Sequence, residues 1–95
     1  MARTRHFHLD QGGHSVTVNV GPGRSGEIEL LVNGKVIGYV GHHDTGTTVL
    51  TGELPEDPPR LFHVRVRQPR LAPLRAACVF EMDGVERPMS ERSVV

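Results

Sequence analysis

Short runs in which polar and apolar residues alternate dominate this chain, and they constrain its fold more than any other feature. Residues 14–20 (HSVTVNV) place Val16, Val18 and Val20 on one face, as in a strand with one side in a core. Residues 6–10 alternate in the same way and place Phe7 and Leu9 on one face. Eleven Gly and seven Pro separate such runs, and helical periodicity is absent. The pattern predicts an all-β fold.

Two tight hairpins are expected, at Asn33-Gly34 and at Asp83-Gly84. Each pair separates two strand-like runs by two residues, and Asn-Gly and Asp-Gly are the residue pairs that type I′ turns favour. The first turn joins residues 27–32 to residues 35–40, and the second joins residues 77–82 to residues 85–89. Further strands are expected at residues 47–51 and 61–67.

The hairpin at Asn33-Gly34 also predicts a register. A two-residue turn pairs Leu31 with Val36 on one face, and pairs Leu30 with Ile37 and Ile28 with Tyr39 on the other. The face with Leu30 is expected to lie in the core. Leu31 and Val36 then form an outward apolar patch beside a strand edge, a surface that can recruit another chain or a second copy.

Seven to eight short strands with turns at this spacing predict an antiparallel β-sandwich. At 95 residues the chain is expected to be one domain, residues 1–95, with a core between about residues 6 and 89. Residues 90–95 show no pattern, and we expect them to fray.

Composition narrows the classes of function. Eleven basic and eleven acidic residues give no net charge, so no global field attracts nucleic acid or an anionic membrane. The chain has no apolar run long enough for a signal peptide or a membrane span. Cys78 is its only cysteine, which excludes an intrachain disulfide and favours the cytoplasm. No cofactor motif is present, and we expect no cofactor.

Six histidines raise the question of a metal site. His6 and His8 share a face of one predicted strand, a spacing that lets two imidazoles reach one ion. His42, His43 or Asp44 would have to complete such a site. The alternative is that His6 and His8 are the solvent face of a strand and that residues 42–44 form a polar loop. We expect the alternative, so we assign no metal ligand, and metal binding remains the second hypothesis.

An amphipathic strand carries the strongest basic feature. In residues 61–67, His63, Arg65 and Arg67 oppose an apolar face, which makes them candidates for binding a partner. Nucleic-acid binding through an arginine cluster is a third hypothesis; the cluster comprises Arg60, Arg65, Arg67, Arg70 and Arg75. We expect nearby carboxylates, Glu56 and Asp57 among them, to neutralise it. Only four aromatic residues are available to stack on bases, so nucleic acid is not the expected partner.

No set of nucleophile, base and orienting group can be assembled from the sequence, so we assign no catalytic residues and do not expect an enzyme. Asp44 and His43 are neighbours in the chain, and on an extended strand they would point to opposite faces. The leading hypothesis is a non-enzymatic module that binds protein or associates with itself.

The order of these features resembles one domain of the Fas apoptotic inhibitory molecule family. The resemblance rests on the strand at residues 14–20, on the run "ELLVNGKVI", and on the closing "ACVFEMDGVERPM" of residues 77–89; it covers residues 7–89. It implies a β-sandwich that acts without catalysis and through protein partners. The chain departs from the family in having one such domain rather than two. Its Gly-, Pro- and Arg-rich, Lys-poor composition is typical of a bacterial protein, so the family's cellular role is not implied.

Overall fold

The structure is a computed structural model that describes residues 4–21, 26–41, 46–68 and 76–92. Within these ranges the chain forms strands and turns and no helix, which confirms the all-β prediction. The described residues accordingly contain no helix of the length and apolar character that crossing a bilayer requires.

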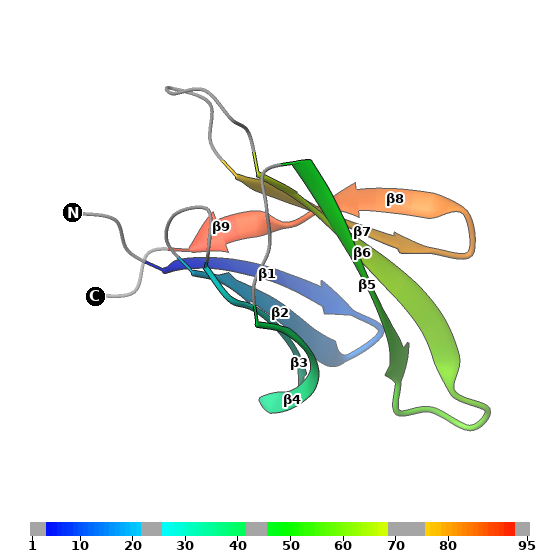
Figure 1. The fold of residues 1–95 in the computed structure, drawn as a ribbon. Helices are drawn as coiled ribbons and strands as arrows, with labels where there is room; N and C mark the ends of the chain where they lie inside the picture. Colours follow the sequence, from blue (N-terminus) through cyan, green and yellow to red (C-terminus); the bar gives the residue numbers. More distant parts are fainter. Residues whose placement is uncertain (1–3, 22–25, 42–45, 69–75, 93–95) are drawn as a thin grey trace.

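Two antiparallel sheets make up the fold (Figure 1). Five strands form sheet A: β1 (Arg5–Gln11), β2 (His14–Val20), β3 (Ile28–Val32), β4 (Lys35–Val40) and β9 (Ser90–Arg92). Four strands form sheet B: β5 (Gly46–Leu54), β6 (Arg60–Gln68), β7 (Ala77–Met82) and β8 (Val85–Pro88). The order is β4-β3-β2-β1-β9 in sheet A and β5-β6-β7-β8 in sheet B, so β4 and β9 are the edges of sheet A.

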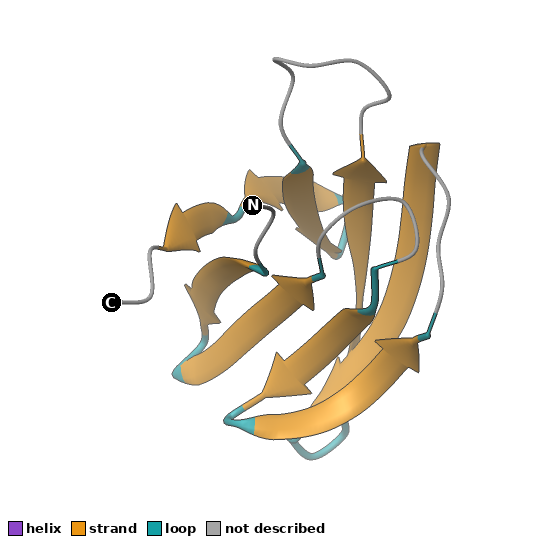
Figure 2. Cartoon of the chain, turned by 60° about the vertical axis from the view of Figure 1, so that its left-hand side comes forward, coloured by secondary structure: helices purple, strands orange, loops and turns teal. Residues whose placement is uncertain are grey.

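The apolar faces of the two sheets pack against each other, as the two layers in Figure 2 show. Alternation explains the core, because every second residue of β2, β3 and β6 is buried. The rings of Phe62 and Phe80 stack at its centre with centroids 5.1 Å apart, and both side chains are fully buried. The inward face predicted for the first two strands is confirmed by the burial of Phe7, Leu9, Val16, Val18 and Val20. The predicted sandwich is therefore present.

Both predicted two-residue hairpins form. Asn33 and Gly34 have φ values of 53° and 83°, and Asp83 and Gly84 have values of 54° and 78°. Positive φ at both central residues is the mark of the type I′ turn, which Asn, Asp and Gly tolerate best. Asn33 is held further by Ser15, whose backbone N–H donates to the Asn33 side-chain oxygen over 3.0 Å. This bond ties the turn to the start of β2.

The predicted register of the first hairpin is correct only next to the turn. Leu31 pairs with Val36 as expected, but Leu30 pairs with Gly38 instead of Ile37. The ladder shifts by one residue between Leu30 and Leu31, so Ile37 is an extra residue in β4. Such a β-bulge bends a strand and re-aims the side chain that it displaces.

The chain passes between the sheets at Met89, after which β9 pairs with β1. The buried Met89 lies between β8 in sheet B and β9 in sheet A, and its N–H donates to the carbonyl of Cys78 over 2.9 Å. The expectation that residues 90–95 fray does not hold for residues 90–92, because backbone pairing with β1 orders them without an apolar pattern. Residues 93–95 lie outside the described residues.

Candidate functional site

His6 and His8 lie on the outer face of sheet A, as the sequence predicted, but each ring binds a different neighbour. His6 Nδ1 lies 2.7 Å from Asn19 Oδ1. His8 Nδ1 lies 3.2 Å from Thr17 Oγ1, and His8 Nε2 lies 2.9 Å from Asp10 Oδ1. Both ring nitrogens of His8 are thus occupied by partners on its own strand and on β2.

The remaining residues proposed as metal ligands, His42, His43 and Asp44, lie outside the described residues. Among the residues that are described, no three His, Cys, Asp or Glu side chains come close enough to hold an ion together. The metal hypothesis therefore gains no support from the part of the chain that the structure describes.

A row of polar contacts crosses sheet A from β1 toward β4. Backbone pairing aligns His6, Asn19, Glu29 and Tyr39 across four strands. Asn19 Nδ2 donates to Glu29 Oε1 over 3.4 Å, and its other side-chain atom, Oδ1, faces the ring of His6. The carboxylate of Glu27 beside the Tyr39 hydroxyl raises the pKa of Tyr39. The row ends at a tyrosine on the sheet edge.

Large apolar side chains are exposed on β4, next to the end of this row. Val36 is 48 %, Ile37 40 % and Tyr39 55 % exposed. The partly buried Leu31 pairs with Val36 and lies on the same outward face. We call Leu31, Val36 and Tyr39 the β4 patch. The patch confirms the outward orientation predicted for Leu31 and Val36, and adds Tyr39, which the expected register had placed on the core side.

The bulge at Ile37 brings β4 close to sheet B. An atom added at the Cβ position of Gly52 in β5 would lie 2.8 Å from Ile37 Cδ1, so the two strands are nearly in contact there. Ile37 therefore covers the gap between the sheets at this side of the sandwich. Because Ile37 is an extra residue in β4, the two outward side chains Val36 and Tyr39 are three residues apart instead of two.

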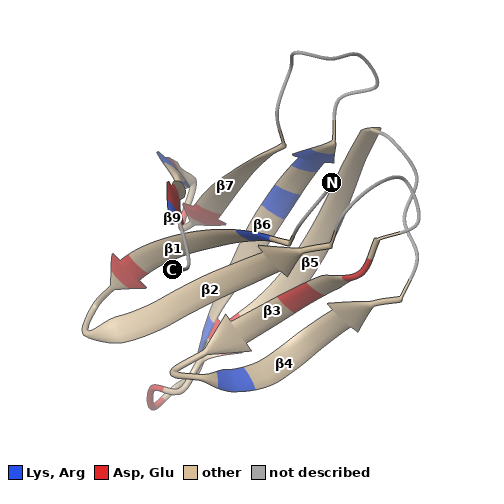
Figure 3. Cartoon of the chain, turned by 90° about the vertical axis from the view of Figure 1, so that its left-hand side faces the viewer, with Lys and Arg blue, Asp and Glu red and all other residues tan. Residues whose placement is uncertain are grey.

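The outer face of sheet B carries His63, Arg65 and Arg67, opposite in the sandwich to the β4 patch. Figure 3 shows the basic segments along β6. Two carboxylates neutralise Arg65: its guanidinium donates to Glu81 over 3.2 Å and also pairs with Glu86. The contact with Glu86 raises the pKa of Arg65.

Acidic partners at this face differ from those expected. Glu56 lies 3.2 Å from His14 Nε2 instead of near the arginines. Arg60 pairs with Asp83 at the second hairpin turn. Arg70 and Arg75 lie outside the described residues. Arg60 and Arg65 are therefore neutralised, as expected for the basic face. The carboxylates that neutralise them belong to β7, to β8 and to the turn between these two strands.

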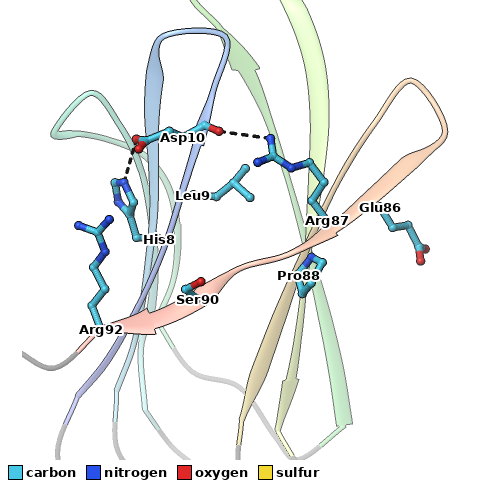
Figure 4. A pocket seen from close by; sticks show the side chains of 8 residues that line it. All are labelled: His8, Leu9, Asp10, Glu86, Arg87, Pro88, Ser90 and Arg92. Carbon is cyan, nitrogen blue, oxygen red and sulfur yellow. Dashed lines mark hydrogen bonds and ion pairs between the residues drawn. The ribbon is translucent and has the colours of Figure 1, made fainter.

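A cleft that the sequence did not indicate lies where β8 and β9 meet β1 (Figure 4). Its lining includes His8, Asp10, Arg87, Ser90 and Arg92. Arg87 Nη1 donates to the backbone carbonyl of Asp10 over 3.2 Å, and the Asp10 carboxylate holds His8. His8, Asp10 and Arg87 are thus linked by these bonds, and the bond from Arg87 fastens β8 to the end of β1. The pairing of β9 with β1 forms one side of the cleft, and that pairing has no sequence signal.

Cys78 is the remaining group with nucleophilic chemistry. Its side chain is buried in the core, and burial raises the pKa of the thiol to about 12. Since the thiolate is the reactive form, we expect this cysteine to react little at neutral pH.

Comparisons of the chain with protein-family models, with curated proteins and with solved structures gave no match.

Proposed function

We propose that the protein is a non-enzymatic module that binds another polypeptide at the edge of β4. One observation carries the proposal: an edge strand exposes Val36, Ile37 and Tyr39, each by 40 % or more. An edge strand offers unpaired backbone N–H and C=O groups, and apolar side chains beside it supply contact area. Unpaired backbone groups and exposed apolar side chains together allow an extended polypeptide to add to sheet A as a further strand.

Other surfaces support binding less well. On the outer face of sheet B, Arg65 is already satisfied by Glu81 and Glu86, so a phosphate or carboxylate ligand would have to displace both. In the cleft beside β9, Arg87 is already used to fasten β8 to β1. On β4, by contrast, three exposed large apolar side chains lie on a single edge strand, and covering them removes apolar area from water.

The resemblance to the Fas apoptotic inhibitory molecule family supports the same class of function, binding without catalysis, and leaves the cellular role open. A lone, free and buried thiol suits a reducing compartment, and we propose the cytoplasm.

Selection of peptides from a random display library tests the proposal directly. Selected peptides should be extended and apolar, and in NMR titrations they should shift the backbone amides of β4 and the patch. Val36→Glu should weaken their binding about tenfold or more, because it places a charge against an apolar contact. Val49→Glu is the matched control, since Val49 is 57 % exposed on sheet B. Peptides that map elsewhere, or equal effects of the two variants, would refute the proposal.

A further inference from the structure

We propose that Asn33-Gly34, the turn between β3 and β4, is a latent deamidation site that the native fold protects and that unfolding exposes. Deamidation converts an asparagine side chain into a carboxylate by attack from the asparagine's own main chain, so it needs no enzyme. Three features carry the inference: the residue pair, the conformation of the turn, and the hydrogen bonds that hold the Asn33 side chain. The inference is independent of the function proposed for β4.

The reaction takes place within the pair itself. The backbone nitrogen of Gly34 loses its proton to a solvent base and attacks Cγ of Asn33. As the new N–Cγ bond forms, the Cγ–Nδ2 bond breaks, and Nδ2 takes up a proton and leaves as ammonia. Water then opens the five-membered succinimide at either of its two carbonyls, which gives aspartate or isoaspartate. Because glycine has no Cβ to hinder its own nitrogen, the ring closes most readily in an Asn-Gly pair.

Solvent has access to this turn. Asn33 and Gly34 are both exposed. In the part of the chain that the structure describes, no atom apart from the chain neighbours lies within 4 Å of the position that a Cβ of Gly34 would occupy. Base and water can therefore reach the pair, and any protection must come from its conformation.

The type I′ turn holds the reacting atoms apart. Ring closure requires the Gly34 nitrogen to lie on the same side of the Asn33 Cα–C bond as Cβ. The first central residue of a type I′ turn has left-handed backbone angles, as the φ of 53° at Asn33 shows. These angles place the Gly34 nitrogen nearly opposite Cβ about that bond. The chain must therefore leave the turn geometry before the ring can close.

Hydrogen bonds to β2 hold the Asn33 side chain away from Gly34. The N–H of Ser15 donates to Asn33 Oδ1 over 3.0 Å, and Asn33 Nδ2 donates to Nδ1 of His14 over 3.1 Å. The amide cannot be reversed, because Nδ2 would then face the N–H of Ser15. His14 Nε2 lies 3.2 Å from the Glu56 carboxylate, so Nε2 carries the ring proton and Nδ1 is left to accept. The Asn33 side chain is thus directed toward β2, whereas Gly34 leads on to β4.

Unfolding removes both forms of protection, and its consequence depends on where the succinimide opens. The aspartate product can form the turn again, because Asp83-Gly84 adopts the same turn in this chain. The isoaspartate product adds an atom to the main chain within a two-residue turn, so it cannot keep the same geometry. Val32 and Lys35 would then lose the spacing at which they pair. Prolonged unfolding should therefore leave some chains with a covalent change that prevents the β3–β4 hairpin from re-forming.

Incubation of the full chain at mildly alkaline pH, with and without guanidinium chloride, tests the protection. Peptide mapping by mass spectrometry measures conversion at Asn33, and circular dichroism checks that the protein without denaturant is folded. The reaction should be at least about tenfold faster in denaturant, because in the native protein the hairpin must first open. Equal rates in the two conditions, or no reaction at Asn33 in denaturant, would refute the inference.

Replacing His14 tests the role of the side-chain hydrogen bonds. His14→Leu should speed native deamidation about three- to tenfold, because it removes one of the bonds that hold the amide. His63→Leu is the matched control, since His63 hydrogen-bonds Thr51 on the other sheet, and its rate should equal that of the wild type. In denaturant all three proteins should react alike. An acceleration in His14→Leu no greater than the rise in its globally unfolded fraction, measured by equilibrium unfolding, would exclude local protection by His14.

Refolding of the reacted protein tests the consequence for the turn. After removal of the denaturant, the aspartate and isoaspartate forms are separated by chromatography and melted. The aspartate form should melt like an Asn33→Asp variant made directly, and the isoaspartate form should melt at a lower temperature. Identical melting of the two forms would contradict the argument from the length of the main chain.

Discussion

Replacing Gly52 by alanine should destabilise the protein, because the site has no room for a methyl group. A Cβ at this position would lie 2.7 Å from Cζ of Phe62 and 2.8 Å from Cδ1 of Ile37. Ordinary contact begins at 3.4 Å, so the Phe62 ring would have to retreat by about 0.7 Å. That ring is fully buried and stacked on Phe80, so it has nowhere to move without disturbing the core.

Two opposing effects set the magnitude. Overfilling a packed core costs about 1–3 kcal/mol. Alanine also restricts the unfolded chain, and this stabilises the folded state by about 0.4–1 kcal/mol where the native backbone conformation suits alanine. Gly52 meets this condition because its φ is not positive. We therefore expect a net loss of about 1–2 kcal/mol and a melting temperature lower by roughly 5–15 °C for a domain of this size.

Thermal melts of Gly52→Ala and Gly38→Ala, at concentrations below any self-association, make the comparison. Gly38 also lies in a strand without positive φ, but a Cβ there would meet Leu30 and Leu50 at ordinary distances of 3.4–3.6 Å. Gly38→Ala should be neutral or stabilising by up to about 1 kcal/mol. In a Phe62→Leu background, which lacks the far ring atoms, Gly52→Ala should cost less. If both alanine variants melt alike, or if Phe62→Leu leaves the cost unchanged, the packing argument is wrong.

Three further outcomes are expected. Asn33→Ala should lower the urea-derived free energy of unfolding by about 1–2 kcal/mol, because alanine tolerates positive φ poorly and loses the bond to Ser15; an unchanged midpoint would contradict this. Cys78, with its pKa raised to about 12, should not react with a thiol reagent in the native protein at pH 8 and should react fully in denaturant; rapid native labelling would argue against its burial. Labelled duplex and single-stranded DNA should show no binding at about 150 mM salt, since Arg65 is neutralised; a complex that weakens with salt and is lost on replacing Arg65 and Arg67 would revive that hypothesis.

Local patterns predicted much of this fold. Alternation identified the buried face of β1, β2 and β6, and the residue pairs Asn33-Gly34 and Asp83-Gly84 located both tight turns. These signals act within one strand or across one turn, where the physics is local. The outward position of Leu31 and Val36 followed for the same reason, because both are adjacent to a turn of known geometry.

Features that depend on distant segments were not predictable in this way. The bulge at Ile37 corresponds to the space that Gly52 leaves in the other sheet, fifteen residues along the chain. Residues 90–92 have no apolar pattern and are ordered by β1 at the opposite end of the described chain. Arg65 was expected to face Glu56 or Asp57, which are near in sequence, whereas Glu81 and Glu86 reach it by strand pairing. The order of strands in the sheets decides such contacts, and alternation carries no information about that order.

Pairing of β9 with β1 has a consequence for the chain during its synthesis. Strands β1 to β4 follow one another in the sequence and pair in that order, so they can form a meander as soon as they leave the ribosome. The contact between Arg5 and Glu91 can form only after another 86 residues have been synthesised. Until then one side of β1 has no partner. A nascent or truncated chain that ends before Met89 therefore presents an open strand beside an incomplete core, and loss of these few C-terminal residues should promote aggregation more than their small buried area suggests.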